Sequence, residues 1–84
     1  MGAMPELDLH RLTIEEAMPR LNSFIYDVFV AEISTVCINH GRGSGTLRQA
    51  VNRELKKNSM VKSFRPGGYY EGGTGVTIVE ISDH

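Results

Sequence analysis

An alternation of short strand-like segments with two amphipathic helical segments constrains the fold of this chain most strongly. A T-x-x-E capping pattern at Thr13 marks the start of the first helix, and apolar side chains then recur every three or four residues. The other segments show the alternating or β-branched patterns of strands. The predicted strands are residues 7–10, 35–39, 61–65 and 76–81, and the predicted helices are residues 14–29 and 47–57.

Two successive β-α-β units predict parallel strands joined by crossovers, with both helices on one face of the sheet. The last hairpin adds a strand of opposite direction, and a flexible glycine-rich connection is expected at residues 66–75. We therefore expect an α/β two-layer sandwich, with a mixed four-stranded sheet whose second face is open to solvent or to a partner. Residues 5–82 are expected to form one domain, and residues 1–4 to be an expression-tag remnant.

The composition is that of an ordinary folded domain, with 40% apolar and 23% charged residues among 84. The single cysteine, Cys37, cannot form a disulfide within the chain and lies in a predicted strand, so we expect it to be buried. No apolar run approaches the roughly 20 residues that a membrane-spanning helix needs. Export and membrane anchoring are not expected, and a reducing cytoplasm is the expected location.

Charge is distributed unevenly along the chain. Residues 1–41 carry two basic and six acidic side chains, whereas residues 42–84 carry seven basic and four acidic ones. The bases are densest between Arg42 and Arg65, where Glu54 is the one acid. Such a stretch is typical of a surface that meets phosphates, although a solvated helix face gives the same pattern.

Ionisable side chains and a glycine-rich loop follow the first two predicted strands. Asp8 and His10 share one face of the first strand, and His40 ends the second. The carboxyl ends of parallel strands meet at one edge of a sheet, which is where α/β sheets place ligands. The loop Gly41–Gly45 leads into a helix N-terminus, and Arg42 adds a charge suited to a phosphate. This edge is therefore the predicted anion site.

Each of these residues also has an ordinary structural interpretation. An exposed strand carboxylate is commonly just solvated, a strand-end histidine commonly just hydrogen-bonds, and loop glycines commonly just allow turns. The pattern H-G-R-G-S-G matches neither the P-loop nor the dinucleotide fingerprint, which argues against a nucleotide cofactor. Tyr69 and Tyr70 either stack on bases or cover the edge of the sheet, and the sequence favours neither alternative.

Four sequence motifs follow one another in a defined order. They are Leu7-Asp8-Leu9-His10, Thr13-x-x-Glu16-Ala17, His40-Gly41-Arg42-Gly43 with Leu47 and Arg48 behind it, and Gly73-Thr74-Gly75-Val76-Thr77-Ile78-Val79. In these motifs, and over residues 5–82, the chain resembles the Smr (small MutS-related) domain family. The stretch at residues 62–64 is most similar to the version at the C-terminus of a bacterial MutS paralogue that suppresses recombination or acts on collided ribosomes. The family often has glycine where this chain has Arg11.

The resemblance implies a nucleic-acid-binding domain, with endonuclease activity on DNA or RNA in many members, as one module of a larger chain. It places Asp8 and His10 on the acidic-x-His pair implicated in cleavage, and His40 to Gly43 on the loop implicated in substrate binding. We expect Asp8, His10 and His40 to be catalytic, with His10 and His40 as acid and base. The expected phosphate-binding residues are His40, Gly41, Arg42, Gly43, Gly45, Arg48, Arg53, Lys57 and Thr74.

Three alternatives remain open at this point. No cofactor is certain, but Asp8 and His10 could hold a divalent cation such as Mg or Mn that activates the attacking water. The domain could instead bind nucleic acid or the ribosome without cleaving it. A third possibility is a protein-interaction domain that uses the open face of the sheet.

Overall fold

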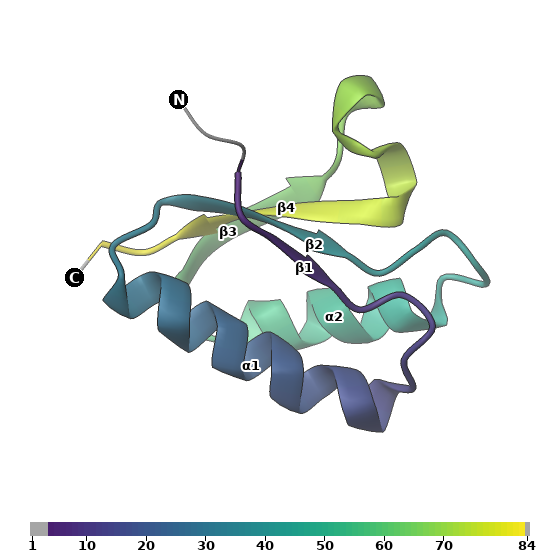
Figure 1. Cartoon of the computed structure of the whole chain (residues 1–84), viewed down its shortest axis with the longest axis horizontal. Helices are drawn as coiled ribbons and strands as arrows, with labels where there is room; N and C mark the ends of the chain where they lie inside the picture. Colours follow the sequence, from purple (N-terminus) through teal and green to yellow (C-terminus); the bar gives the residue numbers. More distant parts are fainter. Residues whose placement is uncertain (1–3, 84) are drawn as a thin grey trace.

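Four strands form one mixed sheet, and two helices pack on one of its faces (Figure 1). The computed structural model describes residues 4–83, so the first three residues of the expected tag remnant lie outside the described part. The elements are β1 (Glu6–Asp8), α1 (Ile14–Val30), β2 (Thr35–Asn39), α2 (Thr46–Lys57), β3 (Val61–Pro66), the 3-10 turns η1 (Tyr69–Glu71) and η2 (Gly73–Gly75), and β4 (Val76–Ile81). The predicted two-layer α/β sandwich is confirmed.

The strand order in the sheet is β1-β2-β4-β3. As predicted, β1 and β2 pair in parallel. The second β-α-β unit differs from the prediction, because β2 and β3 are not neighbours: β4 lies between them and is antiparallel to both. The reason is burial, since β2 and β4 are largely buried on both faces and take the central positions, whereas the more exposed β1 and β3 occupy the edges.

The main core lies between the helices and the sheet. It contains buried side chains from both layers, among them Leu21 and Ile25 of α1 and Val36, Ile38 and Val79 of the sheet. The predicted capping box begins α1: the Glu16 N–H donates to Thr13 Oγ1 at 3.1 Å, and the Thr13 N–H donates to Glu16 Oε1 at 2.9 Å. The capping box and the apolar stripe together fix where α1 begins and which face it buries.

The face of the sheet opposite the helices is not fully open, contrary to the prediction. Cys37, Val76 and Ile78 form a second buried cluster there, with Met4 packed against it. Residues 67–75, expected to be a flexible connection, fold into η1 and η2 and curl over this face, with Gly67 and Gly72 close to Val76 (Figure 1). Between residues 4 and 83, no helix is long and apolar enough to cross a bilayer.

Candidate active site

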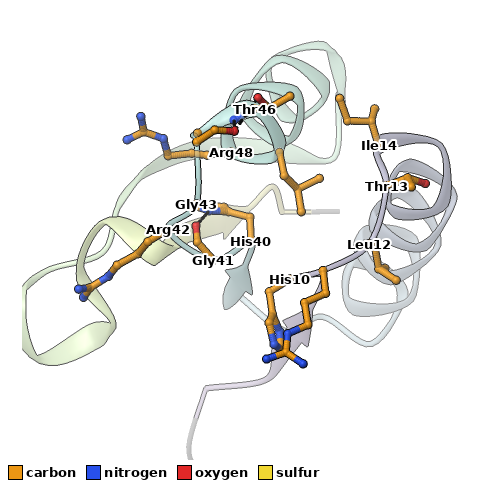
Figure 2. Close-up of a pocket in the computed structure, with 14 residues that line it drawn as sticks. His10, Leu12, Thr13, Ile14, His40, Gly41, Arg42, Gly43, Thr46 and Arg48 are labelled. Carbon is orange, nitrogen blue, oxygen red and sulfur yellow. Dashed lines mark hydrogen bonds between the residues drawn. The ribbon is translucent and has the colours of Figure 1, made fainter.

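A pocket of about 440 Å³ lies where the loops after β1 and β2 meet (Figure 2). Residues 10–14 form one wall, and residues 40–48, which lead into α2, form the other. The two loops are adjacent because β1 and β2 are parallel and end at the same edge of the sheet. The structure therefore brings His10, His40 and the glycine-rich loop together, as the strand pattern predicts.

Asp8 and His10 form a close pair on the face of the sheet away from the helices. Asp8 Oδ1 contacts the imidazole Nδ1 of His10 and also accepts its backbone N–H at 3.1 Å. The imidazole hydrogen bond is the main cause of a lowered pKa at Asp8, so the carboxylate stays ionised. With Nδ1 donating to the carboxylate, Nε2 is the ring nitrogen left for a ligand. About half of each side chain is exposed, 43% for His10 and 53% for Asp8.

Gly41 packs directly against His10. Its backbone has φ +77°, a left-handed conformation that glycine adopts easily, and a Cβ atom there would lie 3.2 Å from the Cβ of His10. The Gly41 N–H donates to Asn39 Oδ1 and to the carbonyl oxygen of Gly75, each at 3.0 Å. The residue before it, His40, also donates its N–H to Gly75. Glycine at position 41 thus allows the loop after β2 to approach His10.

His40 lies beneath the loop, with its side chain on the helix side of the sheet and only 5% of the residue exposed. Its Nδ1 donates to the carbonyl oxygen of Gly41 at 3.0 Å. The hydroxyl of Thr77 lies 2.9 Å from its Nε2 and 3.1 Å from Oδ1 of Asn52 on α2. Burial lowers the pKa of His40 and so favours the neutral ring. Both ring nitrogens of His40 have partners inside the protein.

Arg42 points away from the pocket, toward the loop before β4 (Figure 2). Its Nη2 donates to the carbonyl oxygen of Gly72 at 3.4 Å, and its side chain lies against Gly73 and Gly75. The glycines at 73 and 75 leave the space that this side chain occupies, since a Cβ would approach it to 3.0 and 3.2 Å respectively. Arg42 therefore connects the two loops, in addition to placing its backbone in the wall of the pocket.

The N-terminus of α2 faces the pocket without a capping side chain. Its N-cap is Gly45, with φ +87° and no side-chain hydrogen bond to the first turn. Ser44 Oγ lies 3.4 Å from the Thr46 nitrogen, which is a weak contact. Gly43 has no neighbour within 4 Å of where its Cβ would be, so its backbone is open to the pocket. These amides and the helix dipole form an environment suited to an anion.

The remaining predicted binding residues are at different distances from this pocket. Arg48 is half-buried in the first turn of α2 and lines it. Arg53 and Lys57 are exposed farther along α2, and Lys57 Nζ lies 3.5 Å from a carboxylate oxygen of Glu54. Thr74 is exposed in η2. These last three residues do not line the pocket.

Three residues of the site were not predicted as binding or positioning groups. Arg11 lines the pocket next to His10 and has φ +73°, so it occupies the left-handed turn position where the family often has glycine. Thr77 and Asn52 hold His40 from below. A signal for Thr77 was available, because it shares its strand face with the buried Val79 and Ile81 and is the one polar side chain on that face of β4.

Metal ligands are sparse at this edge of the sheet. Within residues 4–83 no group of three or more His, Cys, Asp or Glu side chains could hold a metal ion. Asp8 and His10 would supply two ligands, and waters or a substrate phosphate would have to complete the coordination of a cation such as Mg²⁺.

This combination of fold and site defines a small α/β domain that presents an acidic-x-His pair next to a glycine-rich anion pocket. The Smr domain family model matches residues 7–82. The chain belongs to the Smr domain family, as its motifs predict.

Solved structures and curated relatives agree with this assignment. The crystal structure of the Smr domain of Thermus thermophilus MutS2 superposes with a TM-score of 0.91 and 35% identity, over 94% of this chain and 99% of that one. YdaL, a stand-alone small MutS-related protein from Escherichia coli, gives a TM-score of 0.90 with 26% identity, over 98% and 70% of the two chains.

Two curated relatives carry the name Endonuclease MutS2. The relative from Clostridium acetobutylicum is 47% identical over 75 residues, and that from Geobacillus thermodenitrificans is 50% identical over 76 residues. These alignments cover 89% and 90% of this chain. The chain spans only 10% of the length of each relative.

Proposed function

We propose that this chain is the nucleic-acid-binding endonuclease module of a larger, MutS2-like protein, and that it cleaves DNA or RNA phosphodiester bonds with weak sequence specificity. The observation that carries the proposal is the position of the exposed Asp8–His10 pair, beside a pocket whose opposite wall is the uncapped N-terminus of α2. A general base and an anion site are the two components that phosphodiester cleavage needs first. The name of the MutS2 relatives supports the same activity.

The pair would act on the attacking oxygen. Nε2 of His10 takes the proton from a water, or from the 2′-hydroxyl if the substrate is RNA, while that oxygen forms its bond to phosphorus and the P–O bond to the leaving oxygen breaks. Asp8 holds the ring through Nδ1 and stabilises the imidazolium that results. The same imidazolium, or a water, then returns a proton to the leaving oxygen.

The opposite wall would hold the phosphate during this step. The backbone of Gly43 and the first amides of α2 face the pocket from one side, and Arg48 and Arg11 are the charged residues among those that line it. Such donors stabilise the negative charge that develops on the phosphoryl oxygens. Arg53 and Lys57 would contact the backbone of a longer nucleic acid along α2.

His40 is better suited to positioning than to proton transfer. Its burial and its two internal hydrogen bonds leave it no free nitrogen for a substrate, but they hold the Gly41 carbonyl and thereby the loop that contacts His10. In this role, His40 fixes the distance between the base and the phosphate site. Thr77 and Asn52 support it from the helix side.

A second candidate function is nucleic-acid or ribosome binding without cleavage. The observation that favours it is that His40 is unavailable, so one exposed imidazole would have to serve as both base and acid. The phosphate pocket and the basic side chains of α2 would be the same in both functions. Salt-dependent binding is therefore expected in either case, and cleavage separates them.

The test is cleavage of end-labelled single-stranded RNA and of supercoiled DNA, with and without a chelator. We expect the parent to cut at least one substrate and the Asp8→Ala, His10→Ala double variant to cut neither, because it lacks the base. Asp27→Ala is the matched control, since it removes an exposed carboxylate from the far end of α1. Equal cutting by the double variant would refute the assignment of the pair.

Two further results would change the mechanism or the function. Loss of cutting in the chelator lanes would favour a cation held by Asp8 and His10 over the metal-free mechanism. Binding that weakens with salt, without any cutting, would favour the binding module.

A further inference from the structure

Tyr69 and Tyr70 are the most exposed large apolar side chains in the described part of the chain. They are 89% and 95% exposed, whereas the others in this class, such as Tyr26 at 57%, are more covered. Their rings contact each other edge to face, with centroids 4.8 Å apart and an interplanar angle of 88°. Side chains with this much exposed surface do not cover the edge of the sheet. Of the two explanations that the sequence left open for these tyrosines, edge covering is therefore removed.

The turn that carries the two tyrosines is held firmly in place. Two nitrogens of the Arg65 guanidinium donate to the two carboxylate oxygens of Glu71, at 2.7 and 3.0 Å. Oε1 of Glu71 also accepts the N–H of Gly68 at 2.7 Å, and the Glu71 N–H donates back to the Gly68 carbonyl at 3.0 Å. A bidentate pair and a capped turn thus flank the tyrosines on both sides, so little backbone freedom is lost when they bind a partner.

The same loop is joined to the candidate active site. Arg42 bonds to Gly72 and packs against Gly73 and Gly75, and Gly75 accepts hydrogen bonds from the backbone at the start of the pocket loop. Figure 2 shows Arg42 extending from the pocket toward this loop. Its guanidinium therefore lies between the anion pocket and the turn with the tyrosines, where it can neutralise an intervening phosphate.

We propose that Tyr69 and Tyr70 form a stacking platform for unpaired bases of a single-stranded nucleic acid whose backbone lies across Arg42 and the anion pocket. This inference rests on the proposed function, because it assumes that the pocket binds a phosphate of the same strand. Aromatic side chains beside a cationic groove are the usual means of binding single strands without sequence preference. A paired base in a duplex has its faces covered by its neighbours and cannot use such a platform.

Oligonucleotides with and without bases provide the test. The probes are fluorescent single strands of about 12 nucleotides, made as oligo(dT), as oligo(rU) and as an abasic DNA of the same length, which keeps the phosphates and lacks the bases. Loss of base stacking weakens binding by about fivefold to a hundredfold. We expect Tyr69→Ala, Tyr70→Ala to weaken the base-containing probes by that factor and to leave the abasic probe unchanged. The Tyr26→Ala variant is the matched control and is expected to bind all probes like the parent.

Tyrosine fluorescence gives a second measurement that does not depend on the double variant. The chain has three tyrosines and no tryptophan, so a Tyr26→Phe variant reports on Tyr69 and Tyr70 alone. We expect oligo(dT) or oligo(rU) to quench this signal and the abasic probe to leave it unchanged. A difference between the two base-containing probes would show which nucleic acid the platform prefers.

The outcomes distinguish failure of the tyrosine platform alone from failure of the proposed nucleic-acid function. Salt-dependent binding of all probes, with equal affinities for base-containing and abasic strands and no effect of the tyrosine substitutions, would overturn the platform and leave the pocket intact. The tyrosine turn would then be a surface for a protein partner. Failure of the parent to bind any probe at low salt would overturn the platform together with the nucleic-acid function.

Discussion

The contact between Gly41 and His10 makes the effect of one methyl group predictable. In Gly41→Ala the new Cβ has to occupy a left-handed conformation at φ +77°, which costs a non-glycine residue about 1–2 kcal/mol. It also lies 3.2 Å from the Cβ of His10, an atom fixed to the backbone, so the loop after β2 and the turn that carries His10 have to move slightly apart. We expect the free energy of unfolding to fall by about 1–2 kcal/mol, which lowers the Tm of a domain of this size by roughly 4–16 °C.

Gly43→Ala is the matched control for this substitution. Gly43 has no positive φ and no neighbour within 4 Å of its missing Cβ, so the same chemical change is expected to leave the Tm near or slightly above that of the parent. Thermal unfolding followed by circular dichroism gives the Tm of both variants. Cleavage assays on the same variants show whether a displaced His10 lowers the cleavage rate. A Gly41→Ala protein with the Tm of the parent would refute the reasoning.

Three other predictions concern stability. Arg11→Gly removes the backbone strain of a non-glycine residue at φ +73° and should raise the free energy of unfolding by about 0.5–1 kcal/mol. Urea titration measures this change, and a lower free energy of unfolding would argue against strain at this position. The pKa of Glu71 is lowered from 4.5 to about 2, mainly by the hydrogen bond from Arg65, so the stability it contributes is complete above about pH 4.5 and is lost between there and about pH 2. In Glu71→Gln, the free energy of unfolding in urea should therefore depend less on pH across that window. An unchanged dependence on pH would contradict the contribution of the Arg65–Glu71 pair. Thr77→Val leaves the buried Nε2 of His40 without a partner and should lower the free energy of unfolding by about 1–3 kcal/mol. Urea unfolding at neutral pH measures this loss, and an unchanged free energy of unfolding would rule it out.

Local patterns were sufficient to predict most of the elements and half of the site. The T-x-x-E box predicted the start of α1, and the alternation at residues 7–10 predicted that Asp8 and His10 lie on the same side. The strand is shorter than predicted, because β1 ends at Asp8 and His10 lies in the turn that follows. Both features depend on the conformation of neighbouring residues, which the sequence encodes directly. The resemblance to the Smr family agreed with them because its motifs lie at these same positions.

The features that were missed depend on distant parts of the chain. Placing β4 between β2 and β3 requires a comparison of how deeply each strand is buried, and local periodicity does not provide it. The side of the sheet that His40 faces could have been inferred from Val36 and Ile38, which have the same parity in the strand. The direction of Arg42 could not, because it follows from glycines more than thirty positions away.

The double hydrogen bond at the carbonyl oxygen of Gly75 has a thermodynamic consequence for ligand binding. This single acceptor receives the N–H groups of two successive residues of the pocket loop, so that loop and the segment entering β4 can separate only if both bonds break together. The backbone of residues 40 and 41, where the loop leaves β2, has therefore already lost most of its conformational entropy before any phosphate arrives. Binding at this edge of the sheet should therefore show little entropy loss from ordering of the protein, and the unfavourable ordering should come from the flexible strand of the ligand.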